Sequence, residues 1–270
     1  MKFSVLLSVY HKENPSYLRQ SLESIENQTR QPDEIIMVKD GPLTDELESV
    51  LAEFEKRLST LKTVSLSRNS GLGIALNEGL KHCSYDLVAR MDTDDICKLD
   101  RFEKQIAVFE QHPEYDLVSA WIEELVDTTD NIRSVRALPE LPEQIYEYGR
   151  KRCPVNHPVT MFRKSSVMHA GGYQHFPYLE DYYLWVRMLL AGYKGYNIQE
   201  PLLHMRAGSA MYSRRAGWGY VKSQANMFKF MKQQGFIGNG QYVKSCVIRS
   251  GSSLAPNWLR KFMFEKVLRK

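Results

Sequence analysis

The sequence contains little cysteine and no long apolar run. Its 270 residues include four cysteines, at positions 83, 97, 153 and 246, and no two of them form a CxxC pair. This spacing argues against a structural zinc site and a disulfide framework, and it suits a reducing cytosol. No apolar stretch approaches the roughly 18 residues that span a bilayer. The apolar run at positions 3–10 is interrupted by Ser4 and Ser8 and precedes no small-residue cleavage site, so it predicts a first strand rather than a signal peptide.

A glycine-rich phosphate-binding loop is also missing. The segment VYHKENP, which follows the first apolar run, contains no GxGxxG pattern and no glycine, so a dinucleotide-binding domain is disfavoured. The sequence has no internal repeat, low-complexity tract or clear linker. Hydrophobic residues make up 43% of the chain and aromatic residues 11%, which is enough for a full core. The length fits one large α/β domain, or one domain with an extension.

Charge is unevenly distributed along the chain. Positions 206–270 hold thirteen of the 36 Lys and Arg residues but only one of the 32 Asp and Glu residues, Glu265. This segment therefore has a net charge of +12, whereas positions 1–205 have a net charge of −8. A basic C-terminal segment predicts contact with an anionic partner, and the alternative is a solvated helical face. No DNA- or RNA-binding motif accompanies it, so nucleic acid is not the expected partner.

Short apolar segments alternate with amphipathic ones through the first half of the chain. They predict strands at residues 3–10, 33–41, 63–67, 85–91 and 116–122, and helices at 14–28, 46–58, 73–83 and 99–111. A further strand and a short helix are expected within 155–173, and a longer helix at 178–193. This order is typical of a Rossmann-like, mostly parallel sheet with helices on both faces. Beyond residue 206 we expect helices in pieces.

Carboxylates are crowded at the end of one predicted strand. In RMDTDDICKLDR, Asp92, Asp94 and Asp95 closely follow the apolar run 87–89. Side chains two residues apart in an extended segment share a face, so Asp92 and Asp94 are expected to converge while Asp95 points elsewhere. Two such carboxylates suit Mg²⁺ or Mn²⁺, which keeps other positions for water and substrate phosphates. The alternative is an acidic turn with no ligand.

Open α/β sheets bind ligands outside the carboxyl ends of their strands. Tyr10, Asp40 and the Asp92 cluster lie at such ends and are expected to converge on one edge.

Five segments, in this order, resemble those of family 2 glycosyltransferases, which have the GT-A fold: SVLLSVYHKE, EIIMVKDG, SRNSGLGIALNEGL, ARMDTDD and YLEDYYLW. The resemblance covers about residues 3–193 and is strongest to bacterial enzymes that build surface polysaccharides. Lys39 and His11 depart from it, since the family often has an acid and an Asn there.

The resemblance implies a uridine site at the matching positions. Tyr10 would lie against the uracil, Asp40 would accept a hydrogen bond from the uracil N3–H, and Glu13 would lie near the nucleoside. The other nucleotide-binding positions that it implies are Arg68, Asn69, Asn77 and Asp92. Asp94 would bind the metal ion together with Asp92. For Asn77, packing on a helix face is the alternative.

The late motif LEDYYLW implies a general base. Asp181 would take the proton from the acceptor hydroxyl as that oxygen attacks the anomeric carbon opposite the leaving diphosphate, and a single displacement of this kind inverts the anomeric centre. Adjacent helical residues point roughly 100° apart, so Glu180 would be structural or face the acceptor. The alternative is that both are ordinary acids at a helix N-terminus.

Five positions are further candidates near the acceptor, the metal or the diphosphate. His157 would line the acceptor side, although a lone histidine is more often a core or loop residue. His204 would complete the metal shell or touch the diphosphate. Arg206 and Arg214, with Arg215, would meet the diphosphate through a closing loop, and a solvated basic loop is the alternative.

Residues 258–268 combine Trp, Phe and basic side chains as membrane-interfacial helices do, and packing of this segment onto the catalytic domain is the alternative.

Together, these features and the resemblance to family 2 glycosyltransferases imply an inverting, metal-dependent transferase. It would move a sugar from a UDP-sugar to a lipid-linked glycan acceptor at the inner face of the cytoplasmic membrane. Residues 1–205 would form the catalytic domain, with a nucleotide-sugar half at 1–122 and an acceptor half at 123–205, and 206–270 the basic extension. One alternative is a nucleotidyltransferase that forms nucleotide-sugars, but VYHKENP lacks the glycine-rich loop of that class. The other is an inactive nucleotide- or sugar-binding module, which the intact Asp92, Asp94 and Asp181 disfavour.

Overall fold

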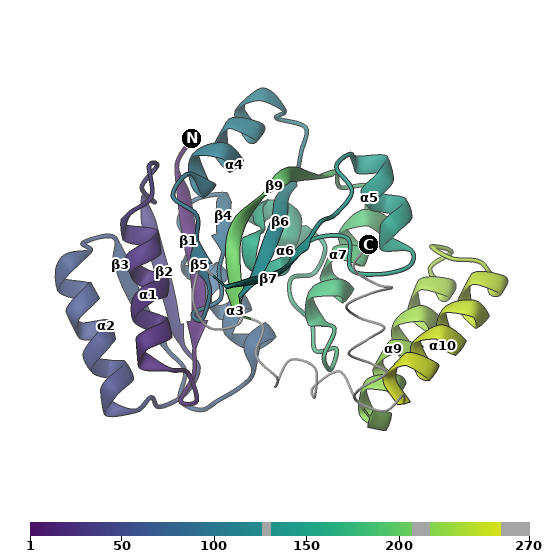
Figure 1. Cartoon of the computed structure of the whole chain (residues 1–270), viewed down its shortest axis with the longest axis horizontal. Helices are drawn as coiled ribbons and strands as arrows, with labels where there is room; N and C mark the ends of the chain where they lie inside the picture. Colours follow the sequence, from purple (N-terminus) through teal and green to yellow (C-terminus); the bar gives the residue numbers. More distant parts are fainter. Residues whose placement is uncertain (126–130, 207–216, 255–270) are drawn as a thin grey trace.

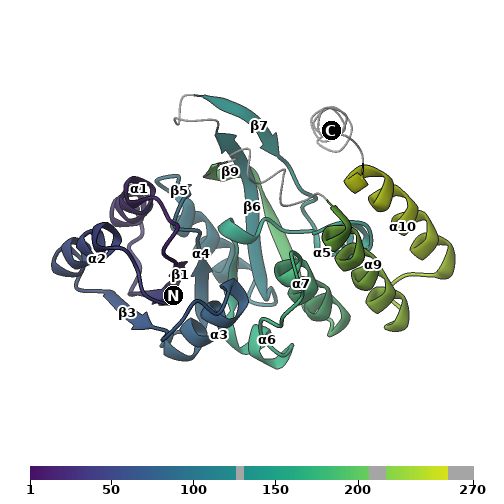
Figure 2. The same ribbon diagram turned by 90° about the horizontal axis from the view of Figure 1, so that it is seen from below.

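The computed structural model describes residues 1–125, 131–206 and 217–254. Within these residues, nine strands form one curled sheet in the order β3-β2-β1-β4-β8-β6-β9-β5, and β7 pairs with β6 (Figures 1 and 2). Strand β1 lies parallel to β2 and β4, β2 lies parallel to β3, and β6 lies parallel to β9. Antiparallel pairs all involve β5, β7 or β8. The predicted α/β architecture is confirmed.

Strands and helices alternate through the first half of the chain, as predicted. These elements are β1 (Phe3–Val9), α1 (Pro15–Glu26), β2 (Glu34–Lys39), α2 (Asp45–Arg57), β3 (Leu61–Ser65), α3 (Leu72–His82) and β4 (Leu87–Arg90). The second half begins with β5 (Ile96–Cys97), α4 (Arg101–Gln111), β6 (Leu117–Leu125), β7 (Ile132–Arg136) and α5 (Pro142–Gly149). It continues with the 3₁₀ helix η1 (His157–Val159), β8 (Met161–Arg163), α6 (Lys164–His169), α7 (Glu180–Leu190), β9 (Gly195–Arg206), α9 (Gly217–Gln233) and α10 (Asn239–Leu254).

Helices cover both faces of the sheet because successive side chains of a strand point to opposite faces. Val5 and Leu7 of β1 belong to a buried cluster that also contains apolar residues of α1, α2 and α4. Leu6, between them, belongs to a second cluster with residues of α3, α6 and α7. Helix α3 approaches the sheet closely at Gly79, where a Cβ atom would lie 2.3 Å from the Leu6 side chain. This close approach packs α3 against β1 and β2.

The first turn after β1 is built as the sequence predicts. The Asn14 side chain accepts a hydrogen bond from the amide of Ser16 at 2.9 Å, and Pro15 occupies the first helical position of α1. The amide of Asn14 in turn donates to the Glu13 carboxylate at 2.8 Å. These contacts hold the segment that carries Tyr10 and Glu13 at the end of the strand.

The described part of the basic C-terminal segment packs on the rest of the chain. Met227, Phe228 and Met231 of α9 share a buried cluster with Ile145 of α5 and Val186 of α7. Helix α10 lies against α9 on the outside of the molecule (Figures 1 and 2). The amphipathic helix predicted at 258–268 lies outside the described residues. Among the helices that are described, none is both long and apolar enough to cross a membrane.

Candidate active site at the carboxyl ends of the strands

The carboxyl ends of β1, β2 and β4 meet at one edge of the sheet, as predicted. Val9 pairs with Lys39, and Leu6 pairs with Arg90, so the residues that follow these strands are neighbours. The Asp40 amide donates to the Val9 carbonyl at 2.8 Å, which places Asp40 beside the start of the Tyr10 turn. Tyr10 is partly exposed at this edge.

Asp40 ties a distant loop to the end of β2. Its carboxylate is buried and accepts hydrogen bonds from the amides of Ser70 at 2.7 Å and Gly71 at 3.0 Å. This brings the exposed Arg68 and Asn69 to the same edge of the sheet. Carboxylate oxygens each have two acceptor sites, and each Asp40 oxygen accepts one hydrogen bond, so Asp40 retains capacity for further donors. Lys39, which stands where the family often has an acid, forms an ion pair: its ammonium lies 2.9 Å from a Glu48 carboxylate oxygen.

Gly41 permits this contact between the two loops. Its φ is 87°, and a Cβ atom would lie 2.5 Å from the amide nitrogen of Asn69. Gly41→Ala is therefore expected to lower the free energy of unfolding by more than the roughly 1–2 kcal/mol of a left-handed conformation alone. Gly192→Ala is the matched control, because Gly192 has φ of 84° with no heavy atom within 4 Å of its Cβ position. Equal losses in thermal unfolding would contradict the steric argument.

The three aspartates of RMDTDDICKLDR form one cluster. One carboxylate oxygen from each of Asp92, Asp94 and Asp95 lies within 4.8 Å of the others. The expectation that Asp95 points elsewhere is wrong, because residues 93 and 94 form a turn rather than an extended segment. The Asp95 carboxylate accepts a hydrogen bond from the Arg206 amide at 3.0 Å. Sequence reasoning therefore missed Asp95 as a member of this group.

Burial and mutual repulsion make the cluster electrostatically unfavourable. Burial, with the nearby charges of Asp92 and Glu13, raises the pKa of Asp94 to about 7. The pKa of Asp95 is raised well above its ordinary value by burial and by the charges of Asp94 and Asp92. Glu13 is held next to the cluster by a hydrogen bond from the Thr93 hydroxyl at 2.6 Å. The site therefore favours any group that brings positive charge.

Arg90 lies next to this cluster, and the sequence analysis did not select it as a site residue. Its side chain is 1% exposed, and its Nη2 pairs with the Asp92 carboxylate. The Arg90 carbonyl accepts a hydrogen bond from the buried Arg101 at 2.6 Å. A charged residue inside an otherwise apolar strand was the available signal, because such residues are rarely fully buried without a partner.

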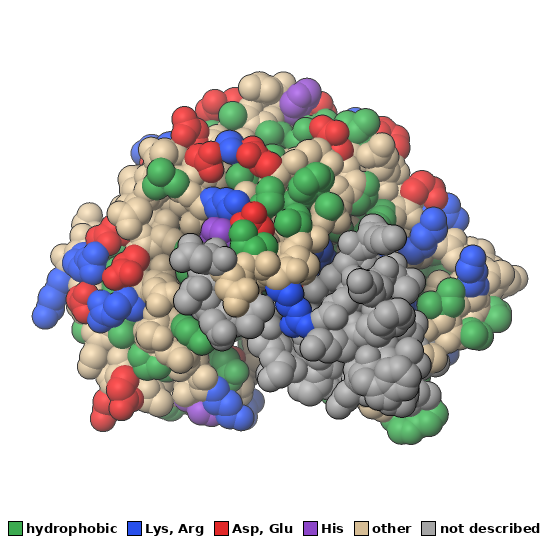
Figure 3. Space-filling model, in the orientation of Figure 1, with side chains coloured by type: hydrophobic (Ala, Val, Ile, Leu, Met, Phe, Trp, Pro, Cys, Tyr) green, Lys and Arg blue, Asp and Glu red, His purple; other side chains and the backbone are tan. Residues whose placement is uncertain are grey.

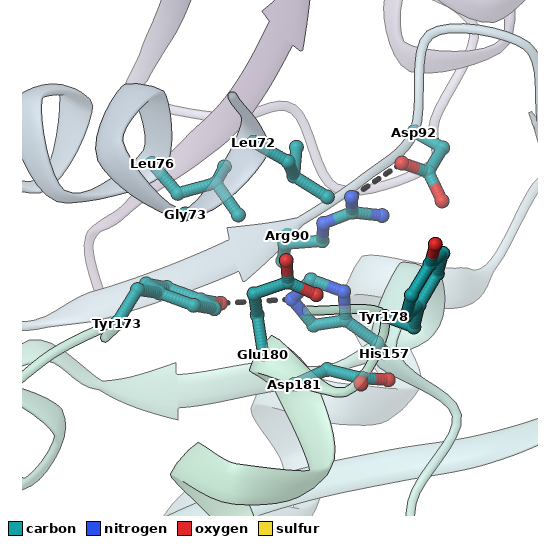
Figure 4. A pocket seen from close by; sticks show the side chains of 10 residues that line it. All are labelled: Leu72, Gly73, Leu76, Arg90, Asp92, His157, Tyr173, Tyr178, Glu180 and Asp181. Atoms are coloured by element: carbon teal, nitrogen blue, oxygen red, sulfur yellow. Dashed lines mark hydrogen bonds and ion pairs between the residues drawn. The ribbon is translucent and has the colours of Figure 1, made fainter. Parts of the chain in front are cut away.

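A pocket joins this cluster to the start of α7 (Figure 4). Its lining comprises Leu72, Gly73, Leu76, Arg90, Asp92, His157, Tyr173, Tyr178, Glu180 and Asp181. Asp92 and Asp181, which are 89 positions apart in the sequence, thus line one cavity. Glu180 lies there as well, and burial raises the pKa of its carboxyl. The Asp181 carboxylate accepts a hydrogen bond from the Tyr182 amide at 2.7 Å, and its other oxygen lies 4.0 Å from the Cys153 sulfur.

His157 and Asn77 have partners within the protein. The His157 Nε2 lies 2.9 Å from the Tyr173 hydroxyl, and burial and the charge of Arg90 lower the pKa of the imidazole well below its ordinary value. The Asn77 side chain donates to the Tyr173 carbonyl and accepts from the Tyr173 amide at 2.8 Å. Asn77 thus joins α3 to the segment that precedes α7.

The structure does not bring His204 into the aspartate cluster. The His204 Nδ1 lies 3.1 Å from a Glu123 carboxylate oxygen, and the His, Cys, Asp and Glu residues that the structure describes form a candidate metal-binding group only at Asp92, Asp94 and Asp95. The Arg206 guanidinium lies 4.1 Å from the centre of the Tyr17 ring. Arg214 and Arg215 lie outside the described residues.

Comparison with known proteins identifies the family. Residues 4–170, more than half of the chain, match the sequence profile of Glycosyl transferase family 2. The chain is a family 2 glycosyltransferase. This result confirms the resemblance and favours a glycosyltransferase over the nucleotidyltransferase alternative.

Relatives of this family 2 glycosyltransferase are similar over its whole length. An uncharacterised glycosyltransferase of Haemophilus influenzae is 45% identical and covers 100% of each chain. The amylovoran biosynthesis glycosyltransferase AmsE of Erwinia amylovora is 42% identical over 98% of each chain. The UDP-Gal:α-D-GlcNAc-diphosphoundecaprenol β-1,3-galactosyltransferase of Escherichia coli is 35% identical over 100% of this chain and 97% of its own. The protein is therefore related to enzymes of bacterial polysaccharide biosynthesis.

Solved structures confirm the GT-A fold of this glycosyltransferase. S. aureus TarS 1–349 in complex with UDP-GlcNAc has a TM-score of 0.70 at 18% identity, over 99% of this chain and 76% of its own. The mannosyltransferase PcManGT of Pyrobaculum calidifontis, in complex with GDP-Man and Mn²⁺, has a TM-score of 0.65 at 14% identity, over 99% and 80%. At these identities the likeness concerns the fold alone.

Proposed function

We propose that this glycosyltransferase moves a sugar from a UDP-sugar to a hydroxyl of a lipid-linked glycan acceptor, with inversion at the anomeric carbon, in the synthesis of a bacterial surface polysaccharide. The observation that carries the proposal is that Asp92, after β4, and Asp181, at the start of α7, line the same pocket. The name of the 35% identical E. coli relative, with its UDP-Gal donor and lipid diphosphate acceptor, supports it.

The uridine would bind at the edge formed by β1 and β2. Tyr10 offers a partly exposed aromatic face for the uracil, and Asp40 has acceptor capacity left for its N3–H. The Asp40 carboxylate also holds the loop of Arg68 and Asn69 through the Ser70 and Gly71 amides. A uracil that binds to Asp40 would therefore also lie next to the loop that the same carboxylate holds in place.

The aspartate cluster fits a divalent cation. Asp92, Asp94 and Asp95 offer oxygen ligands close together, and the Asp95 Oδ2 is buried with no hydrogen-bond partner. Hard carboxylate oxygens are the ligands that Mg²⁺ and Mn²⁺ prefer. We assign Asp94 and Asp92, with Asp95, as the residues that would hold the ion. When bound, the ion would supply positive charge beside the leaving diphosphate.

UDP is expected to bind the protein much more tightly in millimolar Mn²⁺ or Mg²⁺ than in EDTA. The reason is that the diphosphate would otherwise meet three clustered carboxylates, and the Arg90 guanidinium beside them is already paired with Asp92. Titration calorimetry in the two buffers measures the difference, with uridine as the control ligand because it lacks the diphosphate. Equal UDP affinity in both buffers would remove the metal from the proposal.

Asp181 would act as the general base. Its carboxylate lies at the first turn of α7, in the pocket that also contains Asp92. It would remove the proton from the acceptor hydroxyl as that oxygen forms its bond to the anomeric carbon and the bond to the diphosphate breaks. His157 is less suited to this role, because it is buried and its Nε2 is already bonded to Tyr173.

The basic C-terminal segment would place the enzyme at the membrane that holds a lipid-linked acceptor. The supporting observation is the net charge of +12 at positions 206–270, since each basic residue near an anionic surface adds roughly 1 kcal/mol. We therefore expect peripheral binding at the inner face of the cytoplasmic membrane. Co-sedimentation with anionic vesicles should be strong at low salt and weaken as salt rises, while neutral vesicles should bind little. Absence of binding at low salt would exclude this location.

A further inference from the structure

Tyr178 has a backbone conformation that bulky residues rarely adopt. Its φ is 67°, and among the residues that the structure describes it is the one residue other than glycine with a positive φ. Strain of this kind persists where the surroundings impose the conformation, and it concentrates at sites that bind ligands. The conformation of Tyr178 therefore calls for a functional reason.

Packing in the core does not supply that reason. Tyr178 is 53% exposed, and its side chain lines the pocket that contains Asp92, Glu180 and Asp181. Figure 4 shows the ring at the edge of the pocket, below Asp92 and above Asp181 in that view. A half-exposed ring gains only part of the free energy of burial. The strained backbone instead holds an aromatic face at the edge of the pocket.

Helix α9 packs against the Tyr178 ring. The Tyr220 ring meets the Tyr178 ring edge-on, with ring centres 5.8 Å apart. Gly219 lies next to the ring, since a Cβ atom at this position would be in ordinary contact with the Tyr178 hydroxyl, at 3.4 Å. The Ser223 hydroxyl donates to the carbonyl of Pro177, the preceding residue. Three residues of α9 thus contact Tyr178 or the residue before it.

The chemistry around the ring matches a sugar. One face of a pyranose ring presents C–H groups with partial positive charge, which are attracted to the negative face of an aromatic ring. The carboxylates of Glu180 and Asp181, which line the same pocket, accept hydrogen bonds from hydroxyl groups. An aromatic face next to hydrogen-bond acceptors is therefore complementary to a sugar ring with its equatorial hydroxyls.

We propose that the accepting sugar residue of the glycan acceptor stacks on Tyr178, and that α9 holds Tyr178 in position for this purpose. The inference rests on the proposed function, in which Asp181 receives the proton of the acceptor hydroxyl. Tyr178 precedes Asp181 by three residues, at the same end of α7. A sugar stacked on Tyr178 would present a hydroxyl to Asp181, so the basic C-terminal segment would contribute to acceptor selection through α9.

Tyr178→Gly is the decisive variant, because it removes the ring and relieves the strain together. We expect the KM for the acceptor to rise about 10-fold or more, which corresponds to about 1.4 kcal/mol. The thermal unfolding midpoint should stay close to that of the parent, and the KM for the UDP-sugar and the slow hydrolysis of the UDP-sugar without acceptor should not change. Tyr178→Phe keeps the ring and should keep the acceptor KM within about twofold.

Tyr146→Ala is the matched control for removal of a partly exposed tyrosine. Tyr146 is 38% exposed and its ring packs against Phe236, away from the pocket. This variant should leave the KM for the acceptor unchanged. The acceptor probes are glucose, galactose and N-acetylglucosamine α-diphosphates on a short lipid chain, and kinetics are measured with the probe that the parent enzyme uses best.

Three outcomes would overturn the inference. One is a parental acceptor KM in Tyr178→Gly. Another is a raised KM for the UDP-sugar with slower hydrolysis, which would mean that the ring supports the donor sugar. The third is a large loss of thermal stability in Tyr178→Gly, which would assign the ring to packing. Failure of the parent to transfer sugar to any probe, with any UDP-sugar, would instead contradict the proposed function on which the inference rests.

Discussion

Asp181→Asn is expected to lower the rate of sugar transfer by roughly 10²–10⁴-fold, the usual effect of a lost general base. The amide is nearly the same size as the carboxylate, and it can still accept the hydrogen bond that the Tyr182 amide donates at 2.7 Å. The start of α7 should therefore keep its structure. The loss should appear in kcat, because proton removal is part of the transition state and contributes little to ground-state binding.

Glu180→Gln is the matched control for this variant. Glu180 is adjacent in the sequence and lines the same pocket, but neighbouring helical residues point roughly 100° apart. Glu180→Gln should lower the rate of transfer less than Asp181→Asn does, and both variants should bind UDP as the parent does. Steady-state transfer and calorimetry with UDP measure the two effects. A larger loss in Glu180→Gln, or near-parental turnover in Asp181→Asn, would assign the base elsewhere.

Asp94→Asn is expected to lower transfer about 10²–10³-fold, since a metal ion that neutralises developing charge contributes several kcal/mol. UDP binding should also lose most of its dependence on Mn²⁺, because one of three clustered carboxylate ligands is gone. In the absence of metal the variant should be at least as stable as the parent. The substitution removes a partly buried carboxyl whose pKa is raised to about 7, mainly by its removal from water and also by the charge of Asp92.

Asp100→Asn is the matched control for Asp94→Asn. Asp100 is a nearby aspartate whose carboxylate pairs with Lys104 at 2.7 Å and lies outside the cluster. Its replacement should change neither the Mn²⁺ dependence of UDP binding nor the rate of transfer by more than about twofold. Titration of UDP at several Mn²⁺ concentrations separates the variants. Full Mn²⁺ stimulation in Asp94→Asn would contradict the assignment of Asp94.

The two classes of variant affect different quantities. Asp181→Asn should lower kcat with UDP binding intact, whereas Asp94→Asn, like Asp92→Asn, should reduce donor binding and turnover together. Asp92 differs from Asp94 in one respect, because it also pairs with the buried Arg90. Asp92→Asn should therefore lower stability as well, since an unpaired buried charge is costly.

The sequence by itself predicted the alternating strands and helices of the first half. Strand β1 is Phe3–Val9 where 3–10 was expected, and β4 is Leu87–Arg90 where 85–91 was expected. These elements could be predicted because parallel strands covered on both faces are continuous apolar runs, and the helices between them carry a local period. From their order follows the position of Tyr10, Asp40 and Asp92 at one edge.

Strands β5, β7 and β9 were not predicted from the sequence. Strand β9 contains Pro201 and polar residues, and its pairing with β6 is irregular near Trp121. Strand β5 has only two residues and pairs with β9, more than a hundred positions away. Such strands are stabilised by partners distant in the sequence, so their own residues carry little signal.

The tertiary structure alone decided the surroundings of the aspartates and of Tyr178. The turn at residues 93 and 94 brings Asp95 into the cluster, contrary to the alternation of an extended segment. The burial of Arg90 and the positive φ of Tyr178 have no counterpart in local periodicity. Both arise where separate elements meet: Arg90 pairs with Asp92 in a pocket shared with α3 and α7, and residues of α9 hold the segment around Tyr178. Local sequence determined the strands that bring these residues near one another, and long-range packing determined which way their side chains point.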